Sequence, residues 1–220
     1  LLYEREWNLQ KEGNLTTADY DFAKIEKKLS KYLDEDRFQH TMGVMYTSAC
    51  LAMVHGYDIK DAQVAGLLHD CAKCIPNKKK LKMCSEHNIP VSDFERNHPF
   101  LLHSRLGAYI AYAKYGIENQ EILSAINYHT TGKREMSLLE KIIYIADYIE
   151  PMRYKAGRLT EIRRIAFQDL DECMYEILKD TLEYLEEDSA DDIEPTSREA
   201  YVYYKELHNK RSSLTGKEHH

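Results

Sequence analysis

One segment combines an apolar helical pattern with two polar side chains, and it reads Ala62-Gln63-Val64-Ala65-Gly66-Leu67-Leu68-His69-Asp70-Cys71-Ala72-Lys73. The pattern predicts a helix that continues to about Lys73 and is buried on most sides. A carboxylate beside an imidazole is costly to bury unless a partner satisfies both groups, and a metal cation is the usual partner. The His69-Asp70 pair is therefore the first candidate for a functional site.

Four further residues of metal-ligand type stand in apolar, helix-patterned segments of their own, and they are His40, His103, His129 and Asp147. For any one histidine, a core residue that donates to a backbone carbonyl is the default interpretation. Six such residues together are difficult to explain one by one, so the sequence predicts a metal site inside a helical bundle. Mixed imidazole and carboxylate ligation suits iron, manganese, cobalt or zinc better than calcium or magnesium.

The number of candidate ligands is sufficient for two metal ions, with Asp70 as the bridge between them. Two adjacent ions can hold a bridging hydroxide and a phosphate oxygen, which is the arrangement used to hydrolyse phosphoesters and phosphoanhydrides. The sequence therefore indicates phosphate chemistry, and Asp70 is the first candidate for a catalytic residue.

Composition limits the class of protein. The chain has 220 residues, of which 43% are hydrophobic and 30% are charged, as in an ordinary soluble globular domain. Few glycines and prolines, and no run that alternates with period two, predict an all-α, single-domain helical bundle. The net charge of −7 argues against a nucleic-acid partner, whereas a small anionic substrate stays compatible with it.

Periodicity and capping signals predict the helices and the domain limits. The expected helices cover Asp21–Leu33, Arg37–His55, a segment from the cap Asp58 to Lys73, Lys78–His87, Pro99–Tyr115, Glu121–His129, a segment from Ser137 to Pro151, Thr160–Leu185, and a last helix from Thr196. Residues 1–20 form a polar N-terminal extension and 21–212 the helical domain. Residues 213–220 form a tail that resembles part of an expression tag.

Five cysteines leave an odd, unpaired set. Cys71 and Cys74 form a CxxC without a second one, so a zinc ribbon is disfavoured. Free thiols and the lack of a signal peptide favour the cytoplasm. The longest uncharged stretch, 38–57, contains several polar residues and predicts a buried helix, so no membrane partner is expected.

Several residues near the candidate ligands could bind an anionic substrate. Lys73 lies one helical turn after His69, where it could reach a phosphate or extend into solvent. Arg153 follows Pro151, where its guanidinium could hold an anion with two hydrogen bonds. The remaining candidates are His98 and Arg105 around the His103 segment, and Thr130, Thr131 and Gly132 after His129.

Each of these residues also has a simpler interpretation. His98 could cap a helix, and Arg105 could point away from the ligands. The segment Thr130-Thr131-Gly132 could simply end the preceding helix. The run Lys78-Lys79-Lys80 is interpreted as a solvated face.

Longer motifs accompany these residues: Pro99-Phe-Leu-Leu-His103-Ser-Arg-Leu-Gly-Ala, Ala125-Ile-Asn-Tyr-His129-Thr-Thr-Gly132 and Lys141-Ile-Ile-Tyr-Ile-Ala-Asp147-Tyr-Ile-Glu-Pro-Met-Arg153. Together with the order His40, His69-Asp70 and Asp147, they resemble the HD superfamily of metal-dependent phosphohydrolases. Within it, the chain resembles the YqeK-type symmetrical diadenosine-tetraphosphate hydrolases of bacteria, over about residues 32–205.

The resemblance implies a cytoplasmic enzyme that cuts a dinucleoside polyphosphate, diadenosine tetraphosphate, at its centre and releases the nucleoside diphosphate ADP twice. It implies a dinuclear, typically iron-containing centre at the six candidate ligands. Lys73 and Arg153 would stabilise the departing ADP. Cys71 and Cys74 depart from the aliphatic residues that are more usual there. A homodimer is compatible with the sequence.

Two alternatives remain open at this point. A related enzyme of the same superfamily could act on deoxynucleotides or guanosine alarmones, and analysis of the products would distinguish it. A non-catalytic nucleotide-sensing module could keep the bundle, but such modules can lose metal ligands, and here all six are present.

Overall fold

The structure, a computed structural model, describes residues 20–154, 157–188 and 193–215 of the chain. Within these ranges it is helical and contains no strand, which confirms the all-α prediction. The elements are α2 (Phe22–Leu29), α3 (Glu35–His55), α4 (Ile59–Leu68), α5 (Asn77–Glu86), α6 (Asp93–Asn97), the 3-10 turn η1 (Pro99–Leu101), α7 (Leu102–Tyr115), α8 (Gln120–Tyr128), α9 (Leu138–Ile149), α10 (Leu159–Ala166), α11 (Leu170–Asp188) and α12 (Pro195–Thr215).

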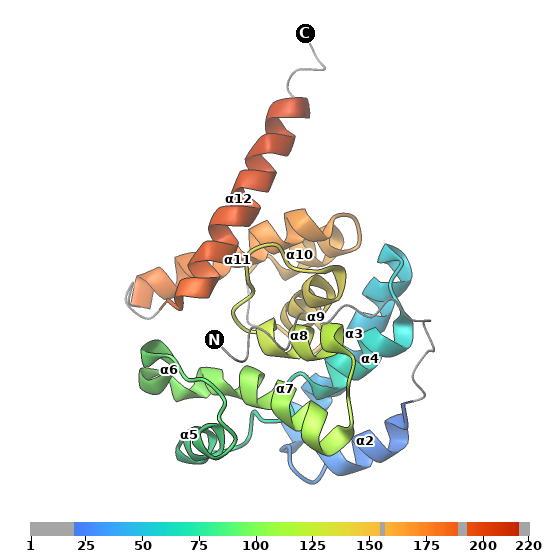
Figure 1. The fold of residues 1–220 in the computed structure, drawn as a ribbon. Coiled ribbons are helices and arrows are strands. Elements are labelled where there is room, and N and C mark those ends of the chain that lie inside the picture. Colours follow the sequence, from blue (N-terminus) through green and yellow to red (C-terminus); the bar gives the residue numbers. More distant parts are fainter. Residues whose placement is uncertain (1–19, 155–156, 189–192, 216–220) are drawn as a thin grey trace.

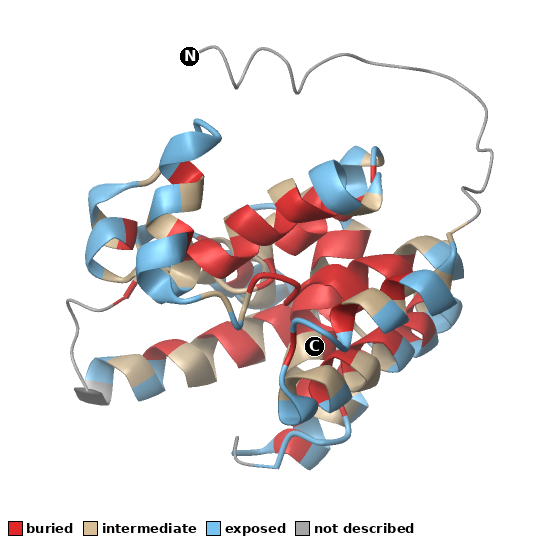
Figure 2. Ribbon diagram, turned by 90° about the horizontal axis from the view of Figure 1, so that it is seen from below, coloured by how far each residue is buried: buried red, intermediate tan, exposed pale blue. Residues whose placement is uncertain are grey.

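The centre of the bundle consists of α3, α4, α8 and α9. Helix α3 packs against α4 and α9, and α8 packs against α4, α7 and α9. Helices α11 and α12 form a pair beside α9 and α10, whereas α5 and α6 flank α7 (Figure 1). Buried residues concentrate where the central helices face one another, and the outer helices expose one side (Figure 2).

Local sequence sets where several helices begin, as predicted. The Asp58 side chain accepts the backbone N–H of Asp61 at the start of α4. Ser92 and Ser137 each form a reciprocal capping box with the glutamate three residues later. These caps satisfy N–H groups that have no partner within the helix.

The segment after α4 differs from the prediction. The helix ends at Leu68 and not at Lys73, because the following backbone bonds join residues three apart. Cys71 N donates to Leu68 O at 3.1 Å, and Lys73 N donates to Asp70 O at 2.9 Å. Such bonds wind the chain more tightly than an α-helix. The His69-Asp70 pair therefore lies at the end of α4 and not in the middle of a helix.

The long helix predicted over Thr160–Leu185 is divided into α10 and α11. Asp169 lies at the break, and its Oδ1 accepts the backbone N–H of Asp171 at 2.9 Å and of Glu172 at 3.1 Å. A carboxylate that satisfies the first N–H groups of a helix stabilises a new helix start. The apolar periodicity continues from α10 into α11, so the sequence pattern did not predict this break.

The structure describes only part of the two terminal segments that the sequence predicted. Residues 1–19 of the predicted extension and 216–220 of the predicted tail lie outside the described ranges, so those domain limits stay predictions. Tyr20 contacts the bundle and donates to Asp61 Oδ1 at 2.9 Å. Among the described helices, none is both long and apolar enough to cross a membrane.

Gly66 allows α4 to lie close to α3. A methyl group at this position would lie 2.9 Å from Ser48 Oγ and 3.0 Å from Met45 Cα. Because Met45 Cα is a backbone atom, the two helices would have to separate to make room. The close approach brings the end of α4, with His69, towards His40 on α3.

We expect Gly66→Ala to lower the free energy of unfolding by about 1–3 kcal/mol, although alanine favours a helix, because overpacking outweighs helix propensity here. Chemical denaturation measures this change. Gly157→Ala is the matched control, since no atom lies within 4 Å of the added methyl group. It should change stability by at most about 0.5 kcal/mol. Equal losses in the two variants would contradict the role of the close contact.

Candidate metal centre

The six predicted ligands converge inside the bundle. His40 comes from α3, His69 and Asp70 from the end of α4, His103 from α7, His129 from the end of α8, and Asp147 from α9. All are buried except Asp147, whose side chain is 19% exposed. Side chains that are 107 residues apart in sequence meet here: His40 Nε2 lies 3.1 Å from Asp147 Oδ1.

Asp70 occupies the middle of the cluster. Its Oδ2 lies 3.5 Å from His69 Nε2 and 4.0 Å from His40 Nε2. Its Oδ1 lies 3.3 Å from His103 Nε2 and 3.5 Å from His129 Nε2. The two carboxylate oxygens therefore face two different pairs of imidazoles, as the arrangement of a bridging ligand requires.

The donor atoms fit a bound metal. Among the described residues, four buried side-chain polar atoms have no hydrogen-bond partner, and three of them belong to this cluster: His40 Nε2, His69 Nε2 and Asp70 Oδ1. An unsatisfied polar atom in a protein interior is costly, so atoms of this kind indicate a ligand that completes the site. Within the described chain, two sets of ligand atoms lie within 4.8 Å of one another: His40, His69 and Asp147, and His69, Asp70 and His129.

The protonation states also suit ligation. Burial alone would raise the pKa of Asp70, but His69, His129 and Lys73 outweigh it and hold the pKa well below its usual range. Burial and the neighbouring His129 lower the pKa of His103, so its imidazole is neutral. An ionised carboxylate and a neutral imidazole are the forms that bind a metal.

His40 behaves differently from His103. Burial alone would lower the pKa of His40, but Asp147 and Glu150 raise it. The carboxylates around His40 thus attract positive charge to this side of the cluster.

Two residues of the site were missed in the sequence. The Arg37 guanidinium lies 2.7 Å from Asp70 Oδ2, and Glu150 Oε1 lies 3.0 Å from His40 Nδ1. Arg37 precedes His40 by three residues, and Glu150 follows Asp147 by three, so each lies close to the helical face of a predicted ligand. That spacing is the signal that could have identified them.

Three of the predicted substrate-binding residues lie at the cluster. Lys73 Nζ lies 3.1 Å from His103 Nε2 and 3.8 Å from Asp70 Oδ1, with 36% of its side chain exposed. Thr130 Oγ1 lies 3.1 Å from His103 Nε2. Arg153 donates through Nη2 to Asp147 Oδ1 at 3.1 Å. Each could therefore reach an anion that binds to the metal.

The other four candidates have different surroundings. Arg105 forms an ion pair with Glu95 at 3.2 Å, and the ring of His98 stacks on Phe94. Thr131 donates to the carbonyl of Gly132, and Gly132, with φ of 64°, ends the turn after α8. The structure does not bring these four residues into the ligand cluster.

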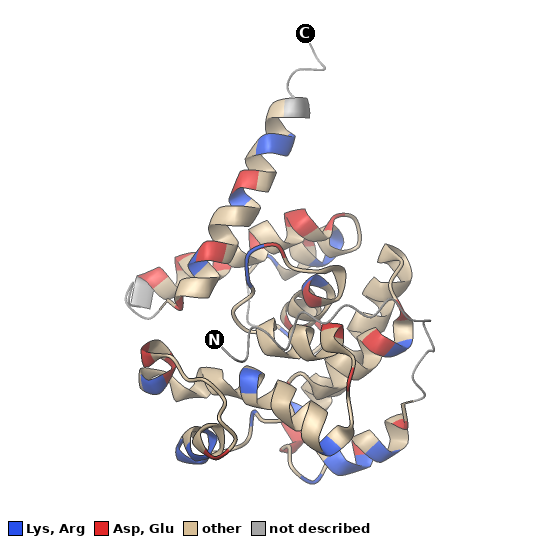
Figure 3. Ribbon diagram, in the orientation of Figure 1, with Lys and Arg blue, Asp and Glu red and all other residues tan. Residues whose placement is uncertain are grey.

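The lysine run on α5 is only partly a solvated face. Lys78 and Lys79 are exposed, but Lys80 is 3% exposed and donates to Asn77 Oδ1 at 3.3 Å. The interpretation of Lys80 as a solvated residue was therefore wrong. Positive residues gather on α5 and α2, although the whole chain is acidic (Figure 3).

The CxxC thiols have protein partners of their own. Cys71 Sγ lies 3.5 Å from the carbonyl of Gly107, and Cys74 Sγ lies 3.3 Å from Asp34 Oδ2. Burial raises the pKa of the Cys71 thiol to about 12, which disfavours the thiolate that a metal would need. None of the candidate metal groups in the described ranges contains a cysteine.

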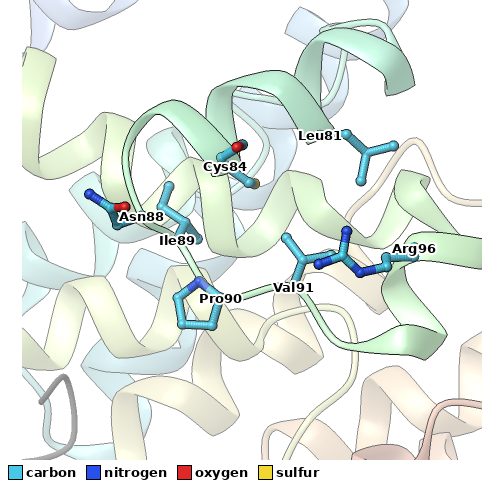
Figure 4. Close-up of a pocket in the computed structure, with 8 residues that line it drawn as sticks. Leu81, Cys84, Asn88, Ile89, Pro90, Val91 and Arg96 are labelled. Carbon is cyan, nitrogen blue, oxygen red and sulfur yellow. The ribbon is translucent and has the colours of Figure 1, made fainter. Parts of the chain in front are cut away.

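A cavity of about 540 Å³ lies away from the cluster, between α5 and the segment that leads to α6 (Figure 4). Its lining is mainly apolar, with Ile89 and Val91, and Arg96 is its one charged side chain. Its lining contains none of the six predicted ligands.

Comparison with known proteins agrees with this geometry. The family model of the HD domain matches residues 37–152, more than half of the chain, and the matched region includes all six ligands. A solved structure from Clostridium acetobutylicum, described as a predicted HD superfamily hydrolase involved in NAD metabolism, superposes with a TM-score of 0.82. It is 36% identical and covers 86% of this chain and 100% of its own. The chain belongs to the HD domain family.

Curated relatives show to which group within the HD domain family the chain belongs. The symmetrical bis(5'-nucleosyl)-tetraphosphatase of Bacillus subtilis (strain 168) is 39% identical, over 71% of this chain and 83% of its own length. The protein of the same name from Halalkalibacterium halodurans is 40% identical, over 70% and 81%. Within the HD proteins, this chain belongs to the family of the symmetrical bis(5'-nucleosyl)-tetraphosphatases, as its motifs predicted.

We expect Asp70→Ala to remove bound metal and activity together, because Asp70 faces both pairs of imidazoles. The melting temperature should also fall, since a metal that binds only the folded state stabilises it. Elemental analysis and thermal unfolding measure the two effects. Asp61→Ala is the control: Asp61 lies on α4, which leads to Asp70, but it bonds to Tyr20 and Asn119. A full metal complement in Asp70→Ala would contradict the bridging role.

Proposed function

We propose that this protein hydrolyses diadenosine tetraphosphate symmetrically and releases two ADP. We further propose that two divalent transition-metal ions bind in the cluster, held by His40, His69, Asp70, His103, His129 and Asp147. The observation that carries the proposal is a buried carboxylate that presents one oxygen to each of two imidazole pairs. The names of the relatives from Bacillus subtilis and Halalkalibacterium halodurans support the substrate and the position of cleavage.

The donor set of imidazoles and carboxylates fits iron, manganese, cobalt or zinc, and the resemblance to the family favours iron among them. Such a pair of ions lowers the pKa of water so that it can attack at neutral pH, and it offsets the charge that develops on the attacked phosphate. In this account the protein holds the ligands rigidly and supplies the cations that act on the rest of the substrate.

We assign that task to Lys73 and Arg153. Lys73 carries its charge at the edge of the cluster, beside Asp70 and His103. Arg153 is anchored by two hydrogen bonds to Asp147, from Nε to the carbonyl and from Nη2 to Oδ1. The remaining N–H groups of its guanidinium can donate to oxygens of the departing ADP. The Thr130 hydroxyl lies 3.1 Å from His103 Nε2, on the same side as Lys73, and can donate to a phosphate oxygen there.

The cellular setting follows from the same proposal. A soluble nucleotide is the substrate, so we propose that the protein acts in the cytoplasm without a nucleic-acid or membrane partner. The presence of all six ligands supports an enzyme over a nucleotide sensor that lacks a catalytic centre.

The products test the reaction directly. Chromatography of diadenosine tetraphosphate after incubation with the iron-loaded protein should show ADP alone. In water enriched in oxygen-18, the label should enter only one of the two ADP molecules of each turnover, because water attacks one phosphorus and the other ADP leaves. Formation of ATP and AMP would overturn the assignment whatever the metal content.

We expect Lys73→Met to keep the metal and to lower kcat/KM by about ten- to a hundredfold. The substitution keeps the aliphatic stem but removes a charged hydrogen bond to phosphate, worth about 1.5–3 kcal/mol. Lys79→Met, on the exposed face of α5, removes the same charge outside the cluster and serves as the control. Unchanged kinetics of Lys73→Met with full metal would mean that Lys73 only extends into solvent.

A further inference from the structure

Glu150 is a buried carboxylate beside the ligand cluster, and the proposed reaction does not account for it. It is 1% exposed and follows the last residue of α9. Its Oε1 lies 3.0 Å from His40 Nδ1, and its Oε2 accepts the backbone N–H of Met152 at 2.6 Å. These two contacts satisfy a charge that would otherwise be costly to bury, and they hold the carboxylate in one orientation.

The partner of Nδ1 distinguishes His40 from the other three histidines. In His69, His103 and His129, Nδ1 donates to the carbonyl oxygen of the residue three positions earlier, at 2.7 Å in each case. Those partners are neutral, whereas the partner of His40 is a carboxylate. A carboxylate that accepts the Nδ1–H of an imidazole fixes the tautomer of the ring, and it makes Nε2 a stronger donor to a metal.

The packing of α3 leaves room for this carboxylate. A methyl group on Gly43 would lie only 2.5 Å from Glu150 Oε2, so any larger residue at that position of α3 would have to displace this carboxylate. The backbone carbonyl of Glu150 accepts hydrogen bonds from Arg153 N at 3.0 Å and from Arg163 Nη2 at 2.9 Å. Glu150 is thus held at both its side chain and its backbone.

We propose that Glu150 is a positioning residue that makes the two metal sites unequal. The ion bound by His40, His69 and Asp147 is the more tightly held one, because His40 alone has a carboxylate behind it. The other ion, on the side of His103 and His129, is held by imidazoles whose partners are neutral carbonyls. This inference rests on the proposed dinuclear centre.

Glu150→Gln tests the inference with little change of shape. Both oxygens of Glu150 accept an N–H, but glutamine offers only one acceptor, so an amide N–H₂ must face either His40 or Met152. A chelator removes Co²⁺ stepwise from the cobalt-loaded protein, and the light absorption of the bound Co²⁺ monitors the removal. This titration measures the affinities of both ions. The parent protein should release its ions in two separate steps. In Glu150→Gln, the Kd of the tighter ion should rise about 10- to 100-fold.

Glu140→Gln is the matched control. Glu140 is also 1% exposed and on α9, but it bonds to Ser124 and Lys133 and lies outside the ligand set. This variant should unfold more easily and keep both Co²⁺ affinities. If Glu150→Gln does not fold, Gly43→Ala provides the second test, because its methyl group displaces the Glu150 carboxylate without removing its charge.

The outcomes separate this inference from the proposed function. Two equal release steps in the parent protein, or a tighter step unchanged in Glu150→Gln, would overturn the role of Glu150. Binding of a single ion by the parent protein would instead overturn the dinuclear centre. Neither measurement depends on the cleavage of diadenosine tetraphosphate, so the substrate assignment can fail independently.

Discussion

A carboxylate buried among four imidazoles is the constraint that organises this protein. Asp70 is 1% exposed, and burial lowers the pKa of the nearby His103, so that neutral imidazole does not balance the charge of Asp70. Arg37 at 2.7 Å and Lys73 at 3.8 Å supply part of the balance. One oxygen of Asp70 and the Nε2 atoms of His40 and His69 still lack hydrogen-bond partners. Cations bound here would complete this interior, so the proposed metal centre would couple metal binding to folding.

Helix ends supply two of the ligands for a physical reason. The last carbonyl groups of a helix have no N–H partner within it. His69 and His129 follow the last residues of α4 and α8, and each donates its Nδ1–H back to a carbonyl three residues earlier. One hydrogen bond thereby satisfies a helix end and orients an imidazole. The same bond points Nε2 towards the shared space, where Asp70 meets it.

The cations that would hold the substrate are tied to the groups that would hold the metals. Arg153 is anchored on Asp147, and Lys73 lies against Asp70 and His103. Glu150 connects His40 to the segment that carries Arg153. In the proposed function, Lys73 and Arg153 are the local positive groups that would face the phosphates of the substrate, although the whole chain has a net charge of −7.

The sequence alone determined the helical class and several helix starts, and it predicted the six residues that converge in the buried cluster. The reason is energetic: an imidazole or carboxylate in an apolar helical segment is costly without a partner, so its presence is informative. The order of the motifs also placed the chain in its family. The capping boxes at Ser92 and Ser137 depend on residues three apart, and such local bonds can be recognised without a fold.

Tertiary structure decided what depends on distant contacts. Nothing beside Arg105 in the sequence shows that it pairs with Glu95, ten residues earlier. Glu150 follows an apolar helix, and its position in the sequence is typical of an exposed helix end. The packing of α3 on α9 instead places it against His40, 110 residues away. The direction of a side chain is set by the helix that packs against it, and the periodicity of one helix contains no information about its neighbour.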